Sequence, residues 1–416
     1  MHACILLPLL RFFLVWFSDT VKFLVLSASH GEGHNTAARN VCDAILSESP
    51  CAEVFVMDLF GIALPRLNHW IQRCYSLAIN QFTFLWKIAF LAFDREGTVE
   101  AVLPLFRLVK HELNRQIEAL SPNIIISTYP LYSFLIRRVR KHSEAARVPF
   151  VTIVTDSTIV NSVWYRYQSD AFVVADGPTA RALLSRGVAL EKIHVLGFPV
   201  SLDFENIVPL PQSAPPPWKI LFLPSTRVAH SLRVARLLLA LPDVYLTILS
   251  GKHPHVAETV RARLNSERLK IFGWTKQVPQ LLASHHLFIG KAGGAITQEA
   301  IAAQCPVVVS HFVPGQEEGN IRLIEGAKIG TLATGSVANV GNAVVRAFSE
   351  DAVLWKFWKK NIVKVGYPSA SRRIAKLLLK MAVFYPHPYD LHFHYAPPSC
   401  PQGLQSSCCA LVAQTG

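Results

Sequence analysis

The chain has 416 residues, of which 51% are hydrophobic and 17% charged, with a mean hydropathy of +0.30 and a formal charge of +13. This length is sufficient for two or three domains with buried cores, and we expect two. The sequence lacks the long uncharged runs of a polytopic membrane protein. The positive charge suits an anionic lipid surface or a nucleic acid equally well and does not choose between them.

The first element is an apolar segment, residues 1–17, which is interrupted by Arg11 and forms most of an extension at residues 1–20. It is too short to span a bilayer and lacks the pattern of a cleaved signal, so we expect a membrane-touching N-terminal extension. Residues 21–27, 36–47 and 52–58 then have the periodicity of a strand, a helix and a strand.

A glycine turn, residues 31–34, joins the first of these strands to the helix and ends in His34. Imidazole accepts protons near neutral pH, so a histidine at a strand tip is a candidate general base. A metal site that includes His30 has no third ligand at a sensible spacing, and we expect no metal and no cofactor.

Residues 62–147 interleave aromatic and basic side chains, which is the composition that a lipid headgroup layer selects. Arg73, Trp86, Lys87 and Arg95 are our candidate lipid contacts. The alternative is a core stripe of aromatic residues with a solvated basic face.

Further strands are expected before a proline-rich segment, residues 207–217, which cannot form an interior helix or strand and is predicted to be a domain linker. The N-terminal domain is therefore residues 21–206. The strand and helix pattern restarts in residues 218–384, which we assign to a C-terminal domain with a closing helix at residues 372–384. Residues 385–416 have no periodicity that could bury a core and are expected to be disordered.

A second glycine turn, Gly293-Gly294, follows an apolar strand in the C-terminal domain and opens a helix. Free backbone N–H groups at such a helix start can bind a diphosphate, and Glu299, one turn further on, can accept from two sugar hydroxyls. Two strand, glycine turn and helix units of this kind predict an α/β protein with two Rossmann-like domains that face a central cleft.

The two motifs, their order and the linker together resemble the monogalactosyldiacylglycerol synthases and the processive diacylglycerol glucosyltransferases. Those enzymes are inverting GT-B glycosyltransferases, related to the lipid II N-acetylglucosaminyltransferase. The resemblance covers about residues 23–384. Its more specific part is Gly293, Gly294, Thr297 and Glu299, followed by the segment 314–320, Pro-Gly-Gln-Glu-Glu-Gly-Asn. The Thr155-Asp156 pair followed by a tryptophan is also similar to that family, whereas Pro224-Ser225-Thr226-Arg227 replaces its usual glycine-rich turn.

The resemblance implies transfer of a hexose from a UDP-sugar to diacylglycerol or a similar lipid at a membrane. His34 is then the candidate base, and Asp156 either orients it or takes the acceptor proton itself. The implied nucleotide-sugar contacts, including a base pocket at residues 272–274, are Gly33, Phe272, Gly273, Trp274, Gly293, Gly294, Thr297, Glu299, Gln316, Glu317 and Asn320.

The expected partners are a UDP-sugar, a lipid acceptor and an anionic membrane surface, without nucleic acid. We expect a peripheral protein on the cytoplasmic face of a membrane, or on a plastid envelope in a plant-like source. Two alternatives share the donor motifs: transfer of N-acetylglucosamine to a polyprenyl-linked acceptor, and a UDP-sugar epimerase of the same fold that transfers nothing.

Overall fold

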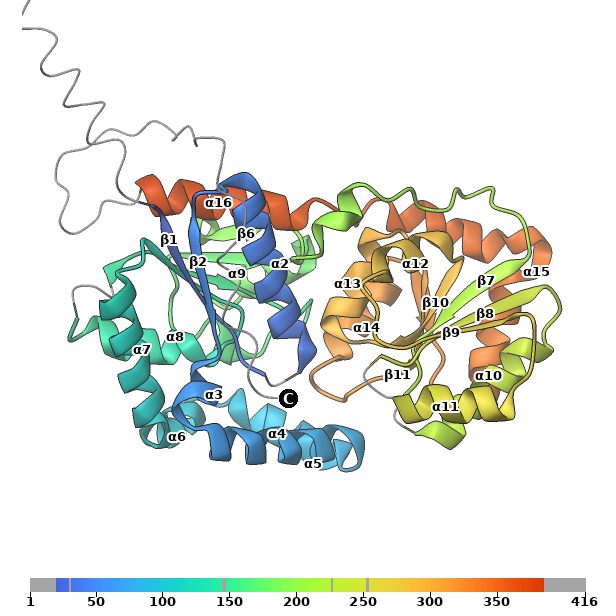
Figure 1. Ribbon diagram of the computed structural model, residues 1–416, viewed down its shortest axis with the longest axis horizontal. Helices are drawn as coiled ribbons and strands as arrows, with labels where there is room; N and C mark the ends of the chain where they lie inside the picture. Colours follow the sequence, from blue (N-terminus) through green and yellow to red (C-terminus); the bar gives the residue numbers. More distant parts are fainter. Residues whose placement is uncertain (1–19, 30, 144–146, 226, 252–253, 385–416) are drawn as a thin grey trace, which may run out of the picture.

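The structure, a computed structural model, describes residues 20–29, 31–143, 147–225, 227–251 and 254–384. It contains two parallel six-stranded sheets side by side, each flanked by helices (Figure 1). This arrangement confirms the α/β class and the two Rossmann-like sheets. The predicted extension at residues 1–20 lies outside the described residues except for Thr20, and the predicted tail at residues 385–416 lies outside them entirely.

The first sheet has the strand order β2-β1-β3-β4-β5-β6. Several of its strands are fully buried apolar runs, as parallel strands covered on both faces should be. The chain leaves β1 in one direction and returns to its other side at β3, so the topological switch point lies between β1 and β3. The strands are β1 Lys22–Leu26, β2 Glu53–Met57, β3 Ile124–Ser127, β4 Phe150–Ile153, β5 Ala171–Val174 and β6 Ile193–Val195.

The second sheet has the order β12-β11-β10-β7-β8-β9, with its switch point between β7 and β10. Residues 207–217, which contain neither helix nor strand, lead into it from the first sheet. We did not predict β12, which is only three residues long. The strands are β7 Trp218–Phe222, β8 Val244–Leu249, β9 Leu269–Phe272, β10 Leu287–Lys291, β11 Val307–His311 and β12 Gly330–Leu332.

Helices connect the parallel strands in both halves. Those of the first half are α2 Glu32–Glu48, α3 Leu59–Ala63, α4 Pro65–Asn80, α5 Thr83–Phe93, α6 Thr98–Val102, α7 Arg107–Leu120, α8 Leu131–Arg140 and α9 Gly177–Leu184. Those of the second half are α10 Val228–Ala240, α11 Pro254–Arg263, α12 Val278–Ser284, α13 Gly294–Ala302, α14 Glu318–Gly326 and α15 Val337–Ile362. The sequence did not predict α15, which is broken by non-helical backbone at residues 349–352.

The last helix, α16 (Ala370–Phe384), corrects one of our domain assignments. We placed residues 372–384 in the C-terminal domain, but α16 lies against α2 on the first sheet (Figure 1). Its apolar face, including Ile374 and Leu378, is buried in the same core as strands β1 and β3. Arg372 pairs with Glu48 of α2 and with Glu205. The helix therefore closes the N-terminal domain.

Helices α4 and α5 follow β2 and run along the lower edge of the first half toward the second (Figure 1). They carry many exposed large apolar side chains, of which Trp70 and Phe84 are 64% and 72% exposed. Among the described residues no single helix has the length and apolar composition to cross a bilayer. Only α4 and α5 taken together meet that test, and they are bent by 118° relative to each other.

Candidate active site

His34 lies in the first turn of α2, immediately after β1 and the turn at Gly31, whose φ is +98°. Its Nδ1 is 2.8 Å from the carbonyl oxygen of Thr128, which follows β3, and 3.0 Å from Oγ1 of Thr155, which follows β4. A carbonyl oxygen only accepts, so Nδ1 carries a hydrogen. In the neutral ring the basic lone pair is therefore on Nε2. The topological switch point thus holds an oriented imidazole.

Aromatic side chains surround this imidazole. The ring of Tyr129 meets it edge-on at 5.2 Å, and the ring of Trp164 lies 6.0 Å away. Trp164 Nε1 also donates to Oδ2 of Asp156 at 2.7 Å. The hydrogen-bond partner of Asp156 is therefore Trp164 and not His34, so our idea that Asp156 orients His34 directly is wrong.

Burial raises the pKa of Asp156 to about 6, although the hydrogen bond from Trp164 opposes that effect. A carboxyl group with this pKa is a competent proton acceptor near neutral pH. The site therefore has two groups that can take a proton, and both contact Trp164.

The second glycine turn lies at the switch point of the other sheet, between β10 and α13. Gly293 is the residue before α13, and the helix begins at Gly294. A Cβ on Gly294 would stand 3.1 Å from the carbonyl oxygen of Thr155. Thr155 therefore contacts His34 with its hydroxyl and faces the start of α13 with its carbonyl group. The two glycine motifs, some 260 residues apart in the sequence, therefore lie on either side of Thr155 where the two halves meet.

Glu299 lies on α13, one turn and a half from its start. Burial raises the pKa of its carboxyl group to about 7. Among the described residues no group donates a hydrogen bond to this carboxylate, which leaves its oxygens available for a ligand. Thr297, by contrast, is fully buried.

Basic side chains gather at the same edge of the second sheet. Burial lowers the pKa of His311, at the end of β11, to about 4, and the charges of Lys291, His230 and Arg227 lower it further. Lys291 is the last residue of β10, and Arg227 immediately precedes α10. These cations lie beside the start of α13, where an anion is favoured.

The segment 313–320 follows β11 and holds three of the predicted sugar contacts. Glu317 is buried, and its carboxylate accepts from Val313 N at 2.9 Å and lies 3.5 Å from Lys291 Nζ. Asn320 donates to the carbonyl oxygen of Ala292 at 2.8 Å. Glu317 and Asn320 therefore hold the segment and the α13 start in place, and only Gln316 presents a partly exposed polar side chain.

The predicted base pocket lies at the end of β9. The carbonyl oxygen of Phe272 accepts from Ser250 N at 2.9 Å, so this backbone group already has a partner. Gly273 is exposed, and Trp274 is 63% exposed. An exposed tryptophan at the edge of the nucleotide sheet has a face on which a base can stack.

The candidate lipid residues divide into two groups. Arg73 and Arg95 are exposed, as a surface contact requires. Trp86 instead packs edge-on against Tyr75 at 4.9 Å, and Lys87 forms a 3.0 Å ion pair with Glu318 of the second half. Trp86 and Lys87 therefore contact the domain junction.

Three site residues were missed from the sequence. Tyr75, Ser157 and Gln298 all contribute hydrogen bonds between the two halves. Ser157 could have been found from its place beside Asp156 at the end of a strand. Tyr75 and Gln298 carry no such signal, because their partners lie 241 and 141 residues away.

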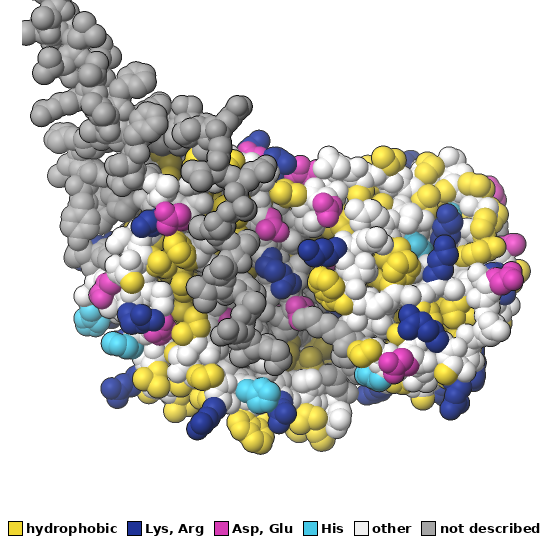
Figure 2. All heavy atoms as spheres, viewed as in Figure 1, with side chains coloured by type: hydrophobic (Ala, Val, Ile, Leu, Met, Phe, Trp, Pro, Cys, Tyr) yellow, Lys and Arg dark blue, Asp and Glu magenta, His cyan; other side chains and the backbone are white. Residues whose placement is uncertain are grey.

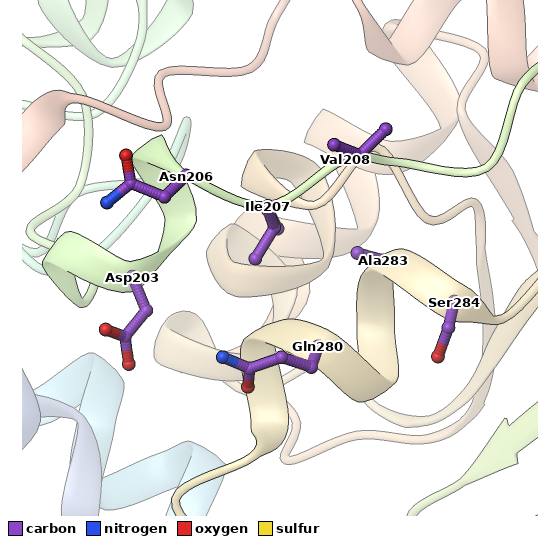
Figure 3. A pocket seen from close by; sticks show the side chains of 7 residues that line it. All are labelled: Asp203, Asn206, Ile207, Val208, Gln280, Ala283 and Ser284. Atoms are coloured by element: carbon purple, nitrogen blue, oxygen red, sulfur yellow. The ribbon is translucent and has the colours of Figure 1, made fainter.

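A cavity of about 320 Å³ lies elsewhere on the domain junction, between the segment that precedes β7 and helix α12 (Figure 3). None of the predicted site residues lines it. Its lining is Asp203, Asn206, Ile207, Val208, Gln280, Ala283 and Ser284. The chemistry at His34, Asp156 and α13 is the stronger evidence for the location of the site.

Comparison with known proteins agrees with the family resemblance that the sequence motifs indicate. Residues 34–200 match the family described as monogalactosyldiacylglycerol (MGDG) synthase. Processive diacylglycerol beta-glucosyltransferases of Bacillus thuringiensis (strain Al Hakam) and Bacillus anthracis (strain A0248) are each 23% identical over 316 residues. Each alignment covers 73% of this chain and 80% of the relative.

Solved structures are similar in fold at low identity. MurG of Acinetobacter baumannii has a TM-score of 0.58 at 12% identity and covers 87% of this chain and 100% of its own. MnaA of S. aureus, solved with UDP, has a TM-score of 0.56 at 16% identity, covering 87% and 98%. The two-sheet arrangement of this chain is therefore the GT-B fold.

Proposed function

We propose that this chain is an inverting glycosyltransferase acting at a membrane surface, because residues 34–200 match the monogalactosyldiacylglycerol synthase family. It moves a hexose from a UDP-sugar to diacylglycerol or a similar lipid alcohol. The observation that carries the proposal is the position of Thr155, which contacts His34 and faces the start of α13. Acceptor activation and diphosphate binding can then occur on opposite sides of one crevice.

In the proposed reaction, Nε2 of His34 takes the proton from the lipid hydroxyl. The hydroxyl oxygen attacks the anomeric carbon from the face opposite UDP, and the bond between that carbon and the diphosphate oxygen breaks. Thr128 and Thr155 hold the imidazole in the tautomer that this step requires. Asp156 is the second candidate acceptor for the proton.

Negative charge develops on the leaving diphosphate as the bond breaks. Free N–H groups at the start of α13 are placed to stabilise it, together with Lys291 and Arg227. Glu299 would bind ribose hydroxyls through its unpaired carboxylate. Gln316 would bind the donor sugar. This assignment keeps the nucleotide contacts in the second half and the proton acceptors in the first.

The membrane contact is proposed for the exposed apolar surface that extends from α3 through α4 and α5 to the start of α7, which we call the apolar edge. Figure 2 shows hydrophobic side chains with interspersed basic and histidine residues along this lower edge of the molecule. Contiguous exposed apolar side chains mark interaction sites, and a patch with cations suits an anionic lipid layer. The apolar edge comprises Ile62, Leu67, Trp70, Leu77, Phe82, Phe84, Leu85, Ile88, Leu91, Phe93, Leu105 and Leu108. A diacylglycerol acceptor lies in such a layer, which supports a peripheral membrane location, and we propose the cytoplasmic face.

The test is product analysis with the full chain and vesicles of diacylglycerol and anionic phospholipid. UDP-glucose and UDP-galactose are supplied separately, and lipid products are identified by mass. Formation of a hexosyl lipid from either donor, and its loss in His34→Ala, is the expected result. Release of free sugar or an epimerised UDP-sugar without any lipid product would overturn the transferase assignment.

A further inference from the structure

Tyr75 connects the two halves at the candidate active site. It belongs to α4 of the first half, and its hydroxyl donates to Oε1 of Gln316 at 3.1 Å. Gln316 is in the segment after β11 that is proposed to bind the donor sugar. A residue of α4 therefore reaches the segment of the second half that is proposed to bind the donor.

The hydroxyl of Tyr75 lies close to the reaction centre. A Cβ on Gly31, in the first glycine turn, would stand 3.6 Å from this oxygen. Burial raises the pKa of Tyr75 to about 12, and the charges of Glu317 and Asp156 contribute to the increase. The phenol therefore remains a neutral hydrogen-bond donor at physiological pH, with groups from both halves around it.

This bond determines what Gln316 can offer a ligand. Its amide oxygen is engaged by Tyr75, whereas its amide nitrogen has no partner among the described residues. The Gln316 side chain is only partly exposed, so its amide N–H groups have limited access to water. A sugar hydroxyl oxygen is the type of acceptor that such a group would bind.

Two neighbouring contacts fix the same segment to α5. Lys87 Nζ pairs with Glu318 Oε1 at 3.0 Å, and this oxygen also accepts from Gly315 N at 3.1 Å. A Cβ on Gly315 would approach the ring of Phe90 to 3.0 Å, so the backbone of the segment packs closely on α5. Tyr75 therefore acts on a segment whose backbone is already held.

We propose that Tyr75 is a positioning residue for recognition of the donor sugar. Its hydroxyl orients the Gln316 carboxamide so that the N–H groups face the hexose. This inference rests on the proposed function, because it requires Gln316 to contact the donor. Since the bond joins the two halves, it forms only when they are together as in this structure.

The test compares affinities for UDP and for each UDP-hexose in Tyr75→Phe, Gln316→Ala, the double variant and Tyr245→Phe. Tyr245, on β8, is a matched control because it is exposed and has no role in the site. Phenylalanine at position 75 keeps the ring that packs against Trp86, and thermal unfolding checks that the fold is retained.

The loss of one neutral hydrogen bond should weaken UDP-hexose binding about three- to tenfold, with UDP binding unchanged. The Michaelis constant for the UDP-hexose should rise, while that for the lipid should not. In the Gln316→Ala background, Tyr75→Phe should have no further effect, because its partner is already absent.

Three results would overturn the inference. The first is that Tyr75→Phe weakens the binding of UDP and of UDP-hexose equally. The second is that the effects of the two substitutions add in the double variant. The third is that Tyr75→Phe leaves UDP-hexose binding unchanged while Gln316→Ala weakens it. Failure of the proposed function has a different signature, since it would appear as the absence of any hexosyl lipid from the wild-type chain.

Discussion

Gln298 on α13 donates a 3.1 Å hydrogen bond from its amide nitrogen to the hydroxyl of Ser157, in the loop after β4. Both side chains are buried. Close to this bond, a Cβ on Gly319 of α14 would stand 1.9 Å from the carbonyl oxygen of Ser157. At Gly319 and Ser157 the two halves therefore meet without room for one more methyl group, and small changes there should alter how they close.

We predict that Gly319→Ala reduces turnover about tenfold to a hundredfold, because the added methyl group collides with the Ser157 backbone and separates His34 from the donor. Overpacking of this kind costs about 1–3 kcal/mol. Steady-state rates with vesicles and both UDP-hexoses measure the effect.

Gly326→Ala is the matched control on the same helix, because nothing lies within 4 Å of a Cβ at that position. It should retain full turnover. Equal activity of the two variants would show that the close contact at Ser157 has no part in catalysis.

We predict that His34→Ala reduces kcat by about 10²- to 10⁴-fold, the typical contribution of a general base. UDP affinity should remain within about twofold, because the proposed diphosphate and ribose contacts belong to the other half. Calorimetric titration of UDP and turnover assays measure the two quantities separately.

His142→Ala, at an exposed position after α8, is the control for this change and should behave as wild type. A parallel loss of UDP affinity and turnover in His34→Ala would contradict the division of roles between the halves. Turnover that survives in His34→Ala but not in Asp156→Asn would transfer the base role to Asp156.

The sheets and both glycine turns could be predicted because buried parallel strands are continuous apolar runs, and their carboxyl ends locate the loops. The placement of α16 could not be predicted. Helical periodicity shows which face of Arg372–Phe384 is apolar, but it does not show which sheet covers that face. The aromatic and basic composition of α4 and α5 suggested a membrane contact for Lys87. Its ion pair with Glu318 depends on the approach of two domains, which local sequence does not encode.

We predict that UDP affinity increases as pH rises toward 8. Burial raises the pKa of Glu299 to about 7, and hydroxyl groups of the ribose donate to the ionised form. Deprotonation of Glu299 should therefore strengthen the binding of UDP. Titration of UDP between pH 6 and pH 8 tests this, and Glu299→Gln should bind UDP more weakly with a flatter pH profile over about that range.

The raised pKa of Glu299 has the opposite effect on the stability of the fold, which should decrease as pH rises. The folded chain holds the Glu299 proton more tightly than the unfolded chain, so the free energy of unfolding should fall as pH rises from 4.5 to about 7. In Glu299→Gln this contribution to the decrease in the free energy of unfolding should be absent. Urea unfolding at several pH values measures it, and identical profiles for the two proteins would exclude a raised pKa at this position.

We predict that Arg73→Glu and Arg95→Glu weaken binding to anionic vesicles, by about 1 kcal/mol for each positive charge removed near the surface. Phe84→Ser and Leu85→Ser should weaken binding to anionic and neutral vesicles alike, because they remove exposed apolar area. Vesicle sedimentation at low and high salt separates the two contributions, since only the charge term is screened.

Lys87→Glu and Arg236→Glu complete this comparison. Lys87 pairs with Glu318, so its reversal should weaken UDP-hexose binding more than vesicle binding. Arg236 is exposed on α10, away from the apolar edge, and its reversal should leave vesicle binding almost unchanged. If Arg236→Glu weakens sedimentation as much as Arg73→Glu does, then vesicle binding reflects the overall charge of +13, and the apolar edge has no special role.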